Sequence, residues 1–166
     1  FVTRKITRAA SRIALGLQDK LFLGNLGAKR DWGHAKDYIE AMYLMLQQPT
    51  PEDYVIATGI TTEVREFVRL SFRDLGIEID FKGEKENEIG FISNIDNTRL
   101  EFLEIKNNQL AIGKELIFVD PAYYRPTEVD LLIGNPEKAH RQLGWKPKYD
   151  LNLLVNDMMK GDLKLM

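Results

Sequence analysis

The sequence contains no cysteine and only two histidines, which lie far apart in the chain. A disulfide framework, a thiolate metal site and a cysteine nucleophile are therefore excluded, and little remains for a zinc site. No uncharged apolar run approaches the roughly 18 residues that span a bilayer, so we expect no membrane partner and a cytoplasmic location. Hydrophobic residues make up 44% and charged residues 29% of the 166 positions, which is typical of a globular domain. This length predicts a single compact unit.

The net charge of −2 is unevenly distributed along the chain. Residues 1–36 carry +6 and the remaining residues carry −8, which favours anion binding near the N-terminal end. The arginine-rich opening through Gln18 also resembles a mitochondrial presequence, although the later chain continues it without a break. Because the chain begins at Phe1 inside an expected helix, we expect this end to be a boundary made by processing or proteolysis.

Strand and helix patterns alternate along the first half of the chain. Apolar residues at three- and four-residue spacing predict helices over residues 2–15 and 36–48, and a third that is capped by Thr61 or Thr62 and ends at Gly76. Residues 21–23, 54–57 and 77–81 are expected strands. This alternation predicts the α/β class.

The pattern changes after Gly83. A charged loop is followed by short alternating runs around Asn107-Asn108 that predict a hairpin, and residues 129–133 are a further expected strand. Asn135-Pro136 predicts the start of a helix that ends at Gly144. Asp150 is expected to cap a final helix.

The first helix carries Arg4 and Lys5 in its opening turn, where the helix dipole already presents partial positive charge. An anion held by the free amide groups would resolve this conflict, so a phosphate site is one interpretation and solvated cations are another. The same stripe could face nucleic acid, but the acidic net charge and the lack of interleaved aromatic residues argue against a nucleic-acid partner.

Two further motifs contain arginine. Arg30 stands between a glycine-containing turn and a helix start, where a guanidinium can hold a phosphate in a bidentate manner; a surface contact with Asp31 is the alternative. A following proline holds Arg125 extended, and Glu128 can accept both hydroxyls of a ribose, although a plain strand entry also explains this segment. His34 is expected to cap or pack rather than to catalyse.

No catalytic constellation is visible in the sequence. Gly24-Asn25-Leu26-Gly27 follows an expected strand, but Arg30 occupies the position of the third glycine of a dinucleotide fingerprint. No tyrosine is followed by a lysine four residues later, and there is no P-loop, paired carboxylates or nucleophile triad. The residues themselves therefore indicate binding and not catalysis.

Several of these segments together resemble one family. They are residues 1–6, 24–38, 54–59, 64–67 and 123–130, with Arg-Asp-Trp-Gly-His and Arg-Pro-Thr-Glu-Val-Asp as the most specific pieces. Over most of its length the chain is similar to the C-terminal half of the GDP-mannose 4,6-dehydratases. These are extended short-chain dehydrogenase/reductases, whose shared ending resembles Leu-Gly-Trp-Lys-Pro at residues 143–147.

The resemblance implies that residues 1–166 form the nucleotide-sugar-binding portion of such an enzyme and lack most of the Rossmann sheet. In this family a Rossmann half binds NADP and carries the catalytic groups, and GDP-mannose becomes GDP-4-keto-6-deoxymannose by an internal hydride transfer. Such lyases belong to nucleotide-sugar metabolism and GDP-fucose biosynthesis, and we expect a homo-oligomer of the full-length protein. None of the family's catalytic side chains can be placed on this chain, so we expect it to be inactive alone.

The resemblance also implies which residues bind the substrate: Val2, Thr3, Lys5, Asn25, Arg30, Arg125 and Glu128. Val2 and Lys5 match positions near the guanine, and Asn25 lies in the turn beside the nucleotide. Arg30 and Arg125 match two clamps on the diphosphate. Glu128 matches the ribose ligand.

Two departures from the family pattern stand out. Gly27 replaces the acidic residue expected in its turn, and an insertion over residues 91–115 makes this connection longer than usual. The insertion is expected to cover the nucleotide, to contact a partner subunit or only to decorate the surface. A second interpretation of the whole chain is a non-catalytic, truncated paralogue that associates with a full-length dehydratase through its helices and this insertion.

Overall fold

The computed structural model describes residues 1–124, 129 and 131–166, which divide into two compact units. The first unit contains residues 1–28, 63–124 and 155–166, and the second contains residues 29–62, 129 and 131–154. The length had predicted one compact unit, whereas each of these two units has buried hydrophobic residues of its own. The chain passes between them four times.

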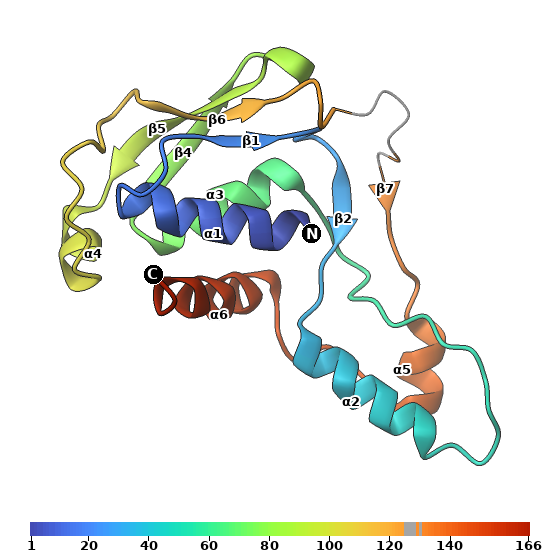
Figure 1. The fold of residues 1–166 in the computed structure, drawn as a ribbon. Helices are drawn as coiled ribbons and strands as arrows, with labels where there is room; N and C mark the ends of the chain where they lie inside the picture. Colours follow the sequence, from blue (N-terminus) through green and yellow to red (C-terminus); the bar gives the residue numbers. More distant parts are fainter. Residues whose placement is uncertain (125–128, 130) are drawn as a thin grey trace. The chain divides into compact units, whose positions relative to one another are not determined.

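The first unit is built on a four-stranded sheet of order β1-β6-β5-β4 (Figure 1). These strands are Leu21–Leu23, Glu115–Val119, Ile89–Ile95 and Ile77–Lys82. The pair β1 and β6 is parallel, with Leu21 opposite Ile117, and the other two pairs are antiparallel. The carboxyl ends of β1 and β6 therefore lie side by side at one edge of the sheet.

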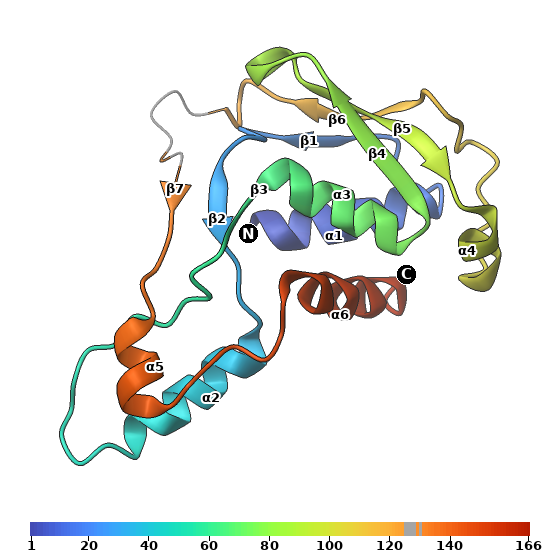
Figure 2. The same ribbon diagram turned by 180° about the vertical axis from the view of Figure 1, so that it is seen from behind.

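Helices α1 (Val2–Ala14) and α3 (Val64–Asp74) cover one face of this sheet (Figure 2). Their apolar residues recur at helical spacing, so each helix buries one stripe and exposes a charged one. The largest buried side chains of this unit come from both layers and include Ile6, Ile13, Phe67, Phe72, Leu75, Ile77, Ile79, Ile92 and Leu116. This packing fixes the start of α1 relative to the edge of the sheet.

Helix α6 (Leu151–Leu163) begins in the second unit and ends in the first. Its expected cap is confirmed, because Asp150 Oδ1 accepts a hydrogen bond of 2.8 Å from the Leu153 amide. In the first unit α6 buries Val155, Met159 and Asp162.

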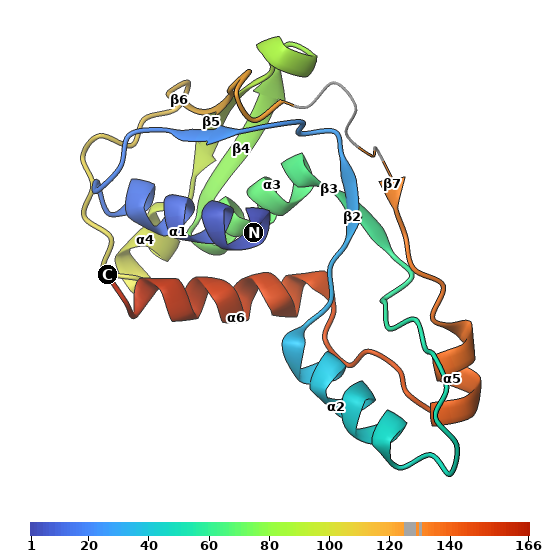
Figure 3. The same ribbon diagram turned by 45° about the vertical axis from the view of Figure 1, so that its right-hand side comes forward.

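The second unit contains a small sheet of order β3-β2-β7 and two helices (Figure 3). The strands are Thr61–Glu63, Lys29–Asp31 and Leu131–Leu132, and the helices are α2 (Ala35–Leu46) and α5 (Glu137–Leu143). Helices α2 and α5 pack together around Ala41, Ala139, Leu143 and Trp145. Gly144 ends α5 in the left-handed conformation with φ of +64°, as the sequence predicted.

Three predictions of local structure are wrong in detail. Residues 54–57 form no strand, and Thr61 and Thr62 belong to strand β3, so Glu63 precedes α3 without a side-chain cap. Strands β5 and β6 are antiparallel neighbours, but helix α4 (Asn97–Phe102) lies between them in place of a hairpin turn. The helices predicted over 2–15 and 36–48 are confirmed within one or two residues.

The predicted insertion, residues 91–115, packs against the C-terminal ends of two helices. Asn107 Nδ2 donates a hydrogen bond of 2.9 Å to the Ile13 carbonyl of α1, and Arg99 Nε donates one of 3.0 Å to the Asp74 carbonyl of α3. Ile13 lies roughly 12 Å along α1 from Lys5, at a rise of about 1.5 Å per residue. These contacts favour a structural role for the segment over a cover for a nucleotide near Lys5.

Within the described ranges, no helix combines the length and the apolar character needed to cross a membrane.

Candidate functional site

Three segments of the first unit meet at one edge of its sheet: the start of α1, the turn after β1 and the turn after β6. The Asp120 amide donates a hydrogen bond of 2.8 Å to the Leu23 carbonyl, which joins the two strand ends. Lys5 Nζ lies 3.7 Å from the centre of the Tyr123 ring, which joins α1 to the same place. In α/β proteins ligands bind beyond the carboxyl ends of parallel strands, so this edge is the candidate site.

Gly24 allows the two turns to touch. A Cβ atom at this position would lie closer than 3.0 Å to the backbone carbonyl oxygen of Tyr123, which is a distance that real Cβ atoms do not show. The backbone of the first turn therefore packs directly on the backbone of the second. Only glycine fits at this contact.

Asn25 shapes the turn in which it lies. Its Oδ1 atom accepts a hydrogen bond of 2.9 Å from the Gly27 amide, and the Leu26 and Ala28 carbonyls accept bonds of 3.0 Å from the first two amides of α3. The chain then continues into strand β2 and not into a helix. This turn consequently lacks the helix N-terminus that holds the pyrophosphate of a dinucleotide, so it does not fit the main nicotinamide-cofactor site.

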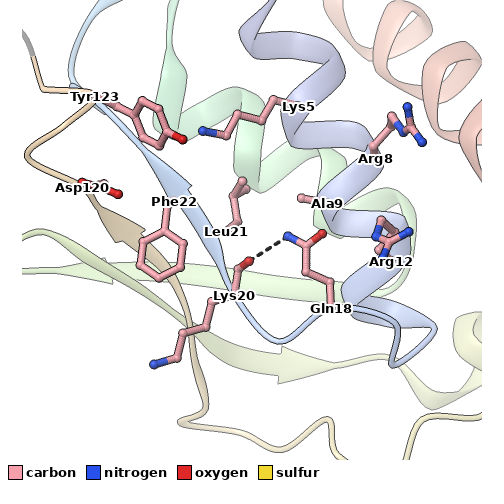
Figure 4. A pocket seen from close by; sticks show the side chains of 10 residues that line it. All are labelled: Lys5, Arg8, Ala9, Arg12, Gln18, Lys20, Leu21, Phe22, Asp120 and Tyr123. Atoms are coloured by element: carbon pink, nitrogen blue, oxygen red, sulfur yellow. Dashed lines mark hydrogen bonds between the residues drawn. The ribbon is translucent and has the colours of Figure 1, made fainter.

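Lys5 is the cation that faces this edge (Figure 4). Burial lowers the pKa of its ammonium group, and the nearby Asp120 carboxylate partly opposes that shift. Val2 and Thr3 lie in the same opening turn of α1 and are half-buried. The structure thus brings Val2, Thr3, Lys5 and the Asn25 turn into one unit around a single sheet edge.

The charge conflict at the start of α1 is resolved within the chain. Arg4 Nη2 lies 3.2 Å from Asp162 Oδ1, and the same carboxylate accepts a hydrogen bond of 2.6 Å from the Thr7 hydroxyl. Asp162 is buried near the end of α6. The buried Asp162 carboxylate therefore compensates the charge of Arg4, which was the role that the sequence suggested for a bound anion. No local pattern predicted this contact, because Asp162 lies 155 or more residues from Thr7 and Arg4.

A second buried carboxylate supports the Asn25 turn from the other side. Arg65 Nη1 lies 2.9 Å from Glu88 Oε1, and Arg65 Nε lies 3.1 Å from Glu63 Oε2. A Cβ atom at Gly27 would lie 3.2 Å from Arg65 Nη2. The acidic residue expected at position 27 is thus absent, and Glu63 and Glu88 supply the negative charge beside Arg65.

The buried position of Glu88 predicts a pH dependence. Burial raises the pKa of its carboxyl, with Arg65 opposing the shift. Because the folded state holds the proton more tightly, the free energy of unfolding is expected to fall as pH rises from the unfolded pKa of about 4.3 through the raised pKa of the folded state. Urea unfolding of Glu88→Gln at a series of pH values should give a flatter profile in this window, and parallel profiles for the two proteins would contradict the prediction.

In the second unit Arg30 lies on β2. Its Nη1 atom donates hydrogen bonds of 2.8 Å to the carbonyls of Lys29 and Val129. The Asp31 carboxylate accepts hydrogen bonds from Thr58 and from the Gly59 amide, and so anchors the segment before β3. Arg30 is thereby held by backbone carbonyls of its own unit.

His34 caps and packs, as the sequence predicted. Its Nδ1 atom accepts a hydrogen bond of 3.1 Å from the Lys36 amide at the start of α2, and its ring stacks on Tyr149 at 4.2 Å between centres. The imidazole is buried, and its Nδ1 atom is used in the cap.

Arg125 and Glu128 lie outside the described residues, so their assignment to the diphosphate and the ribose stays a prediction. Arg30 lies in the second unit and Lys5 in the first, and each is described within its own unit. Among the residues that the structure does describe, no cluster of three or more histidine, aspartate or glutamate side chains could hold a metal ion.

Solved structures share the fold of this chain. The structure of RMD from Pseudomonas aeruginosa complexed with NADPH matches with a TM-score of 0.68 and 18% identity, over 100% of this chain and 43% of that chain. UDP-glucose 4-epimerase from Bifidobacterium longum, in complex with NAD+ and UDP, matches with a TM-score of 0.61 and 14% identity, over 96% and 39%. The chain therefore shares the α/β fold of the matching parts of these two proteins, and the predicted fold class is confirmed.

Sequence comparison narrows this class to one family. The family profile described as GDP-mannose 4,6 dehydratase matches residues 1–158. GDP-mannose 4,6-dehydratases from Yersinia enterocolitica and Dictyostelium discoideum are each 49% identical over 99% of this chain, covering 42% and 41% of their own lengths. The chain belongs to the GDP-mannose 4,6-dehydratase family, which confirms the resemblance, and it spans about two fifths of the length of these curated relatives.

Proposed function

We propose that this chain is the GDP-mannose-binding portion of a GDP-mannose 4,6-dehydratase. Family membership supports the ligand class, and the meeting of α1, the Gly24 turn and the Tyr123 turn supports a binding site at this edge. The single observation that carries the proposal is Lys5, a cation held against the Tyr123 ring where two parallel strands end.

Each binding residue has a chemical role in this proposal. Lys5 donates to the carbonyl oxygen O6 of guanine, which is an acceptor where adenine has an amino group. Val2 and Thr3 lie beside the base, and Asn25 shapes the adjoining turn. Arg30 and Arg125 hold the diphosphate, since a guanidinium can form two parallel hydrogen bonds with a phosphate group. Glu128 accepts the ribose hydroxyls.

The reaction itself is assigned to the longer enzyme of the family. In the proposal that enzyme is a lyase, which removes water from GDP-mannose to give GDP-4-keto-6-deoxymannose, and a nicotinamide cofactor, NADP, supplies the internal hydride transfer. This chain supplies substrate binding and no catalytic side chain. A cytoplasmic location and a homo-oligomer of the full-length protein stay predictions.

Exchanging Lys5 tests the proposal. Lys5→Met keeps the stem of the side chain and removes its charge, so GDP affinity is expected to fall by about 10- to 150-fold, the equivalent of a charge-assisted hydrogen bond of about 1.5–3 kcal/mol. Affinity for ADP, which starts weaker, is expected to change little. Isothermal titration calorimetry with both nucleotides measures the difference.

Lys106→Met is the matched control, because Lys106 is an exposed lysine of the same unit. It is expected to bind GDP as the unaltered chain does. The proposal is overturned if Lys5→Met and Lys106→Met bind GDP equally well, or if Lys5→Met weakens GDP and ADP by the same factor.

A second candidate function, association with the catalytic part of a family protein, is favoured by the surface of α2. Ile39, Met42, Tyr43 and Leu46 recur at helical spacing and are 57–83% exposed. An open apolar stripe of this kind marks a docking surface. Since the curated relatives are more than twice as long as this chain, we propose that their remaining part is the occupant.

Binding experiments with the rest of a family protein distinguish association through α2 from association through the insertion. The complementary part of the Yersinia enterocolitica relative, made as a separate polypeptide, is expected to form a complex with the chain in size-exclusion chromatography. Met42→Lys combined with Leu46→Lys should weaken the complex, whereas Phe102→Lys combined with Ile112→Lys, at exposed apolar residues of the insertion, should not. The opposite ranking would assign association to the insertion.

A further inference from the structure

A cavity of about 470 Å³ lies in the first unit between α1 and β1, within the range of about 300–1,000 Å³ that is usual for small-molecule sites. Lys5 and Asp120 both line it, and Figure 4 shows their charged groups at the same end, beside Tyr123. Asp120 is the one acidic residue among the described side chains of the lining. The proposed guanine contact uses Lys5 and leaves this carboxylate unassigned.

Asp120 is held in place by its backbone and by one of its carboxylate oxygens. Its amide donates a hydrogen bond of 2.8 Å to the Leu23 carbonyl, and its own carbonyl accepts bonds of 2.9 and 3.0 Å from the Tyr123 and Tyr124 amides. The Oδ1 atom accepts one of 2.9 Å from the Ala122 amide. The Oδ2 atom accepts no hydrogen bond from a described residue, so a ligand in the cavity can use it.

The charges of Lys5 and Asp120 face one cavity without forming an ion pair. No such pair joins these two described residues, although the carboxylate is close enough to oppose the burial that lowers the pKa of the ammonium group. Lys5 Nζ instead lies 3.7 Å from the centre of the Tyr123 ring. This end of the cavity therefore offers a group that can only donate hydrogen bonds and a separate group that can only accept them.

Guanine matches this pair of groups. Along one edge of the base, O6 accepts hydrogen bonds and N2 donates them, and the N1–H group between the two is a further donor. Adenine carries an amino group in place of O6 and an acceptor nitrogen at N1, so each charged group would meet a group of its own kind. A site that leaves its polar groups unpaired in this way rejects the wrong ligand.

We propose that Asp120 is a specificity-determining residue for guanine, whose carboxylate accepts hydrogen bonds from the N1–H and N2–H groups of the base while Lys5 donates to O6. This inference deepens the proposed function and rests on it, because it takes the Lys5 end of the cavity as the base site. Asp120 decides which nucleotide binds and has no part in the chemistry of the sugar.

Asp120→Asn changes the hydrogen-bonding character of the group and keeps its place. The asparagine Oδ1 atom can still accept the Ala122 amide, whereas an amino group replaces the Oδ2 acceptor. GDP affinity should therefore fall by about 10- to 150-fold. Affinity for xanthosine diphosphate, which has an oxygen in place of the N2 amino group, should rise by at least about tenfold. Isothermal titration calorimetry with both nucleotides measures this exchange of preference, which a purely structural loss would not produce.

Asp96→Asn is the matched control. Asp96 is an exposed aspartate of the same unit, and its Oδ1 atom also accepts a hydrogen bond from a backbone amide, that of Arg99. It does not line the cavity, so the affinities for both nucleotides are expected to stay unchanged. The inference is overturned if Asp120→Asn and Asp96→Asn give the same ratio of GDP affinity to xanthosine diphosphate affinity.

Inosine diphosphate tests the inference on the unaltered protein, and it replaces the variant if Asp120→Asn unfolds, as judged by circular dichroism. This nucleotide keeps O6 and N1–H and lacks the N2 amino group, so it should bind at least about tenfold more weakly than GDP. Equal affinity for the two would overturn the inference and leave the proposed function standing. Absence of GDP binding by the unaltered protein would instead overturn the proposed function and this inference together.

Discussion

Replacement of Trp145 by alanine is expected to lower the free energy of unfolding of the second unit by about 3–5 kcal/mol, the usual cost of truncating a buried tryptophan. Trp145 is 1% exposed and packs with Ala41, Ala139 and Leu143. Its Nε1 atom also donates a hydrogen bond of 2.9 Å to the Asp37 carbonyl. The other buried side chains of this cluster are two alanines and one leucine, so Trp145 supplies most of its buried volume.

The effect should be confined to one unit. Hydrogen exchange followed by mass spectrometry is expected to show lost protection over residues 29–62 and 131–154 and retained protection over residues 63–124. Trp145→Phe is the control, since it keeps an aromatic ring and loses the indole hydrogen bond, at a cost of about 1–2 kcal/mol. Equal loss of protection in both units would show that they unfold together.

The helices could be predicted because their pattern is local. Residues spaced three and four apart in the sequence form the buried face of α1, and the same holds for α3 and α6. The helix ends could also be predicted, because glycine favours the positive φ angles that Gly16, Gly76 and Gly144 adopt there. Such a helix can be predicted without knowing which residues it packs against.

The false strand over residues 54–57 shows the limit of such patterns. Tyr54 and Ile56 pack against the Trp145 cluster, and Ala57 is buried against Gly134, where an added Cβ would come closer than 3.0 Å. The alternation of apolar residues there reflects packing on a helix pair and not pairing in a sheet. Preference for a strand depends strongly on such context.

Only part of the candidate site could be predicted, because several of its contacts join residues that are far apart in the sequence. Lys5 and the Asn25 turn could be singled out from local chemistry, but their supports could not. Asp162 reaches Arg4 and Thr7 from the other end of the chain, and Glu88 reaches Arg65 across 23 residues. Contacts at such separations leave no periodic trace in the sequence.

Gly24→Ala is expected to disrupt the candidate site more than any other small substitution in it. The added Cβ would overlap the Tyr123 carbonyl oxygen, which is backbone and cannot rotate away, so the two turns must separate. Forcing an atom into a close contact costs about 1–3 kcal/mol of stability. Separation also draws the Tyr123 ring from Lys5, so GDP affinity should fall by at least about tenfold, or about 1.4 kcal/mol.

Gly161→Ala is the matched control for this substitution. Gly161 lies within α6 and an added Cβ would meet nothing within 4 Å, so alanine should stabilise the helix by about 0.5–1 kcal/mol and leave GDP binding unchanged. Thermal unfolding and calorimetry of both variants make the comparison. If Gly24→Ala binds GDP as tightly as Gly161→Ala does, the Gly24 turn has no part in the site.

A double-mutant cycle then identifies how the Gly24 contact acts. If Gly24 acts by placing the Tyr123 ring against Lys5, removal of the Lys5 charge leaves less for Gly24→Ala to disturb, and the losses of GDP affinity in Gly24→Ala and Lys5→Met add to more than the loss in the double variant. If Gly24 acts through Asn25 instead, the two losses are independent and add. The coupling therefore separates a site built on the cation at the start of α1 from one built on the turn after β1, although both contain the same residues.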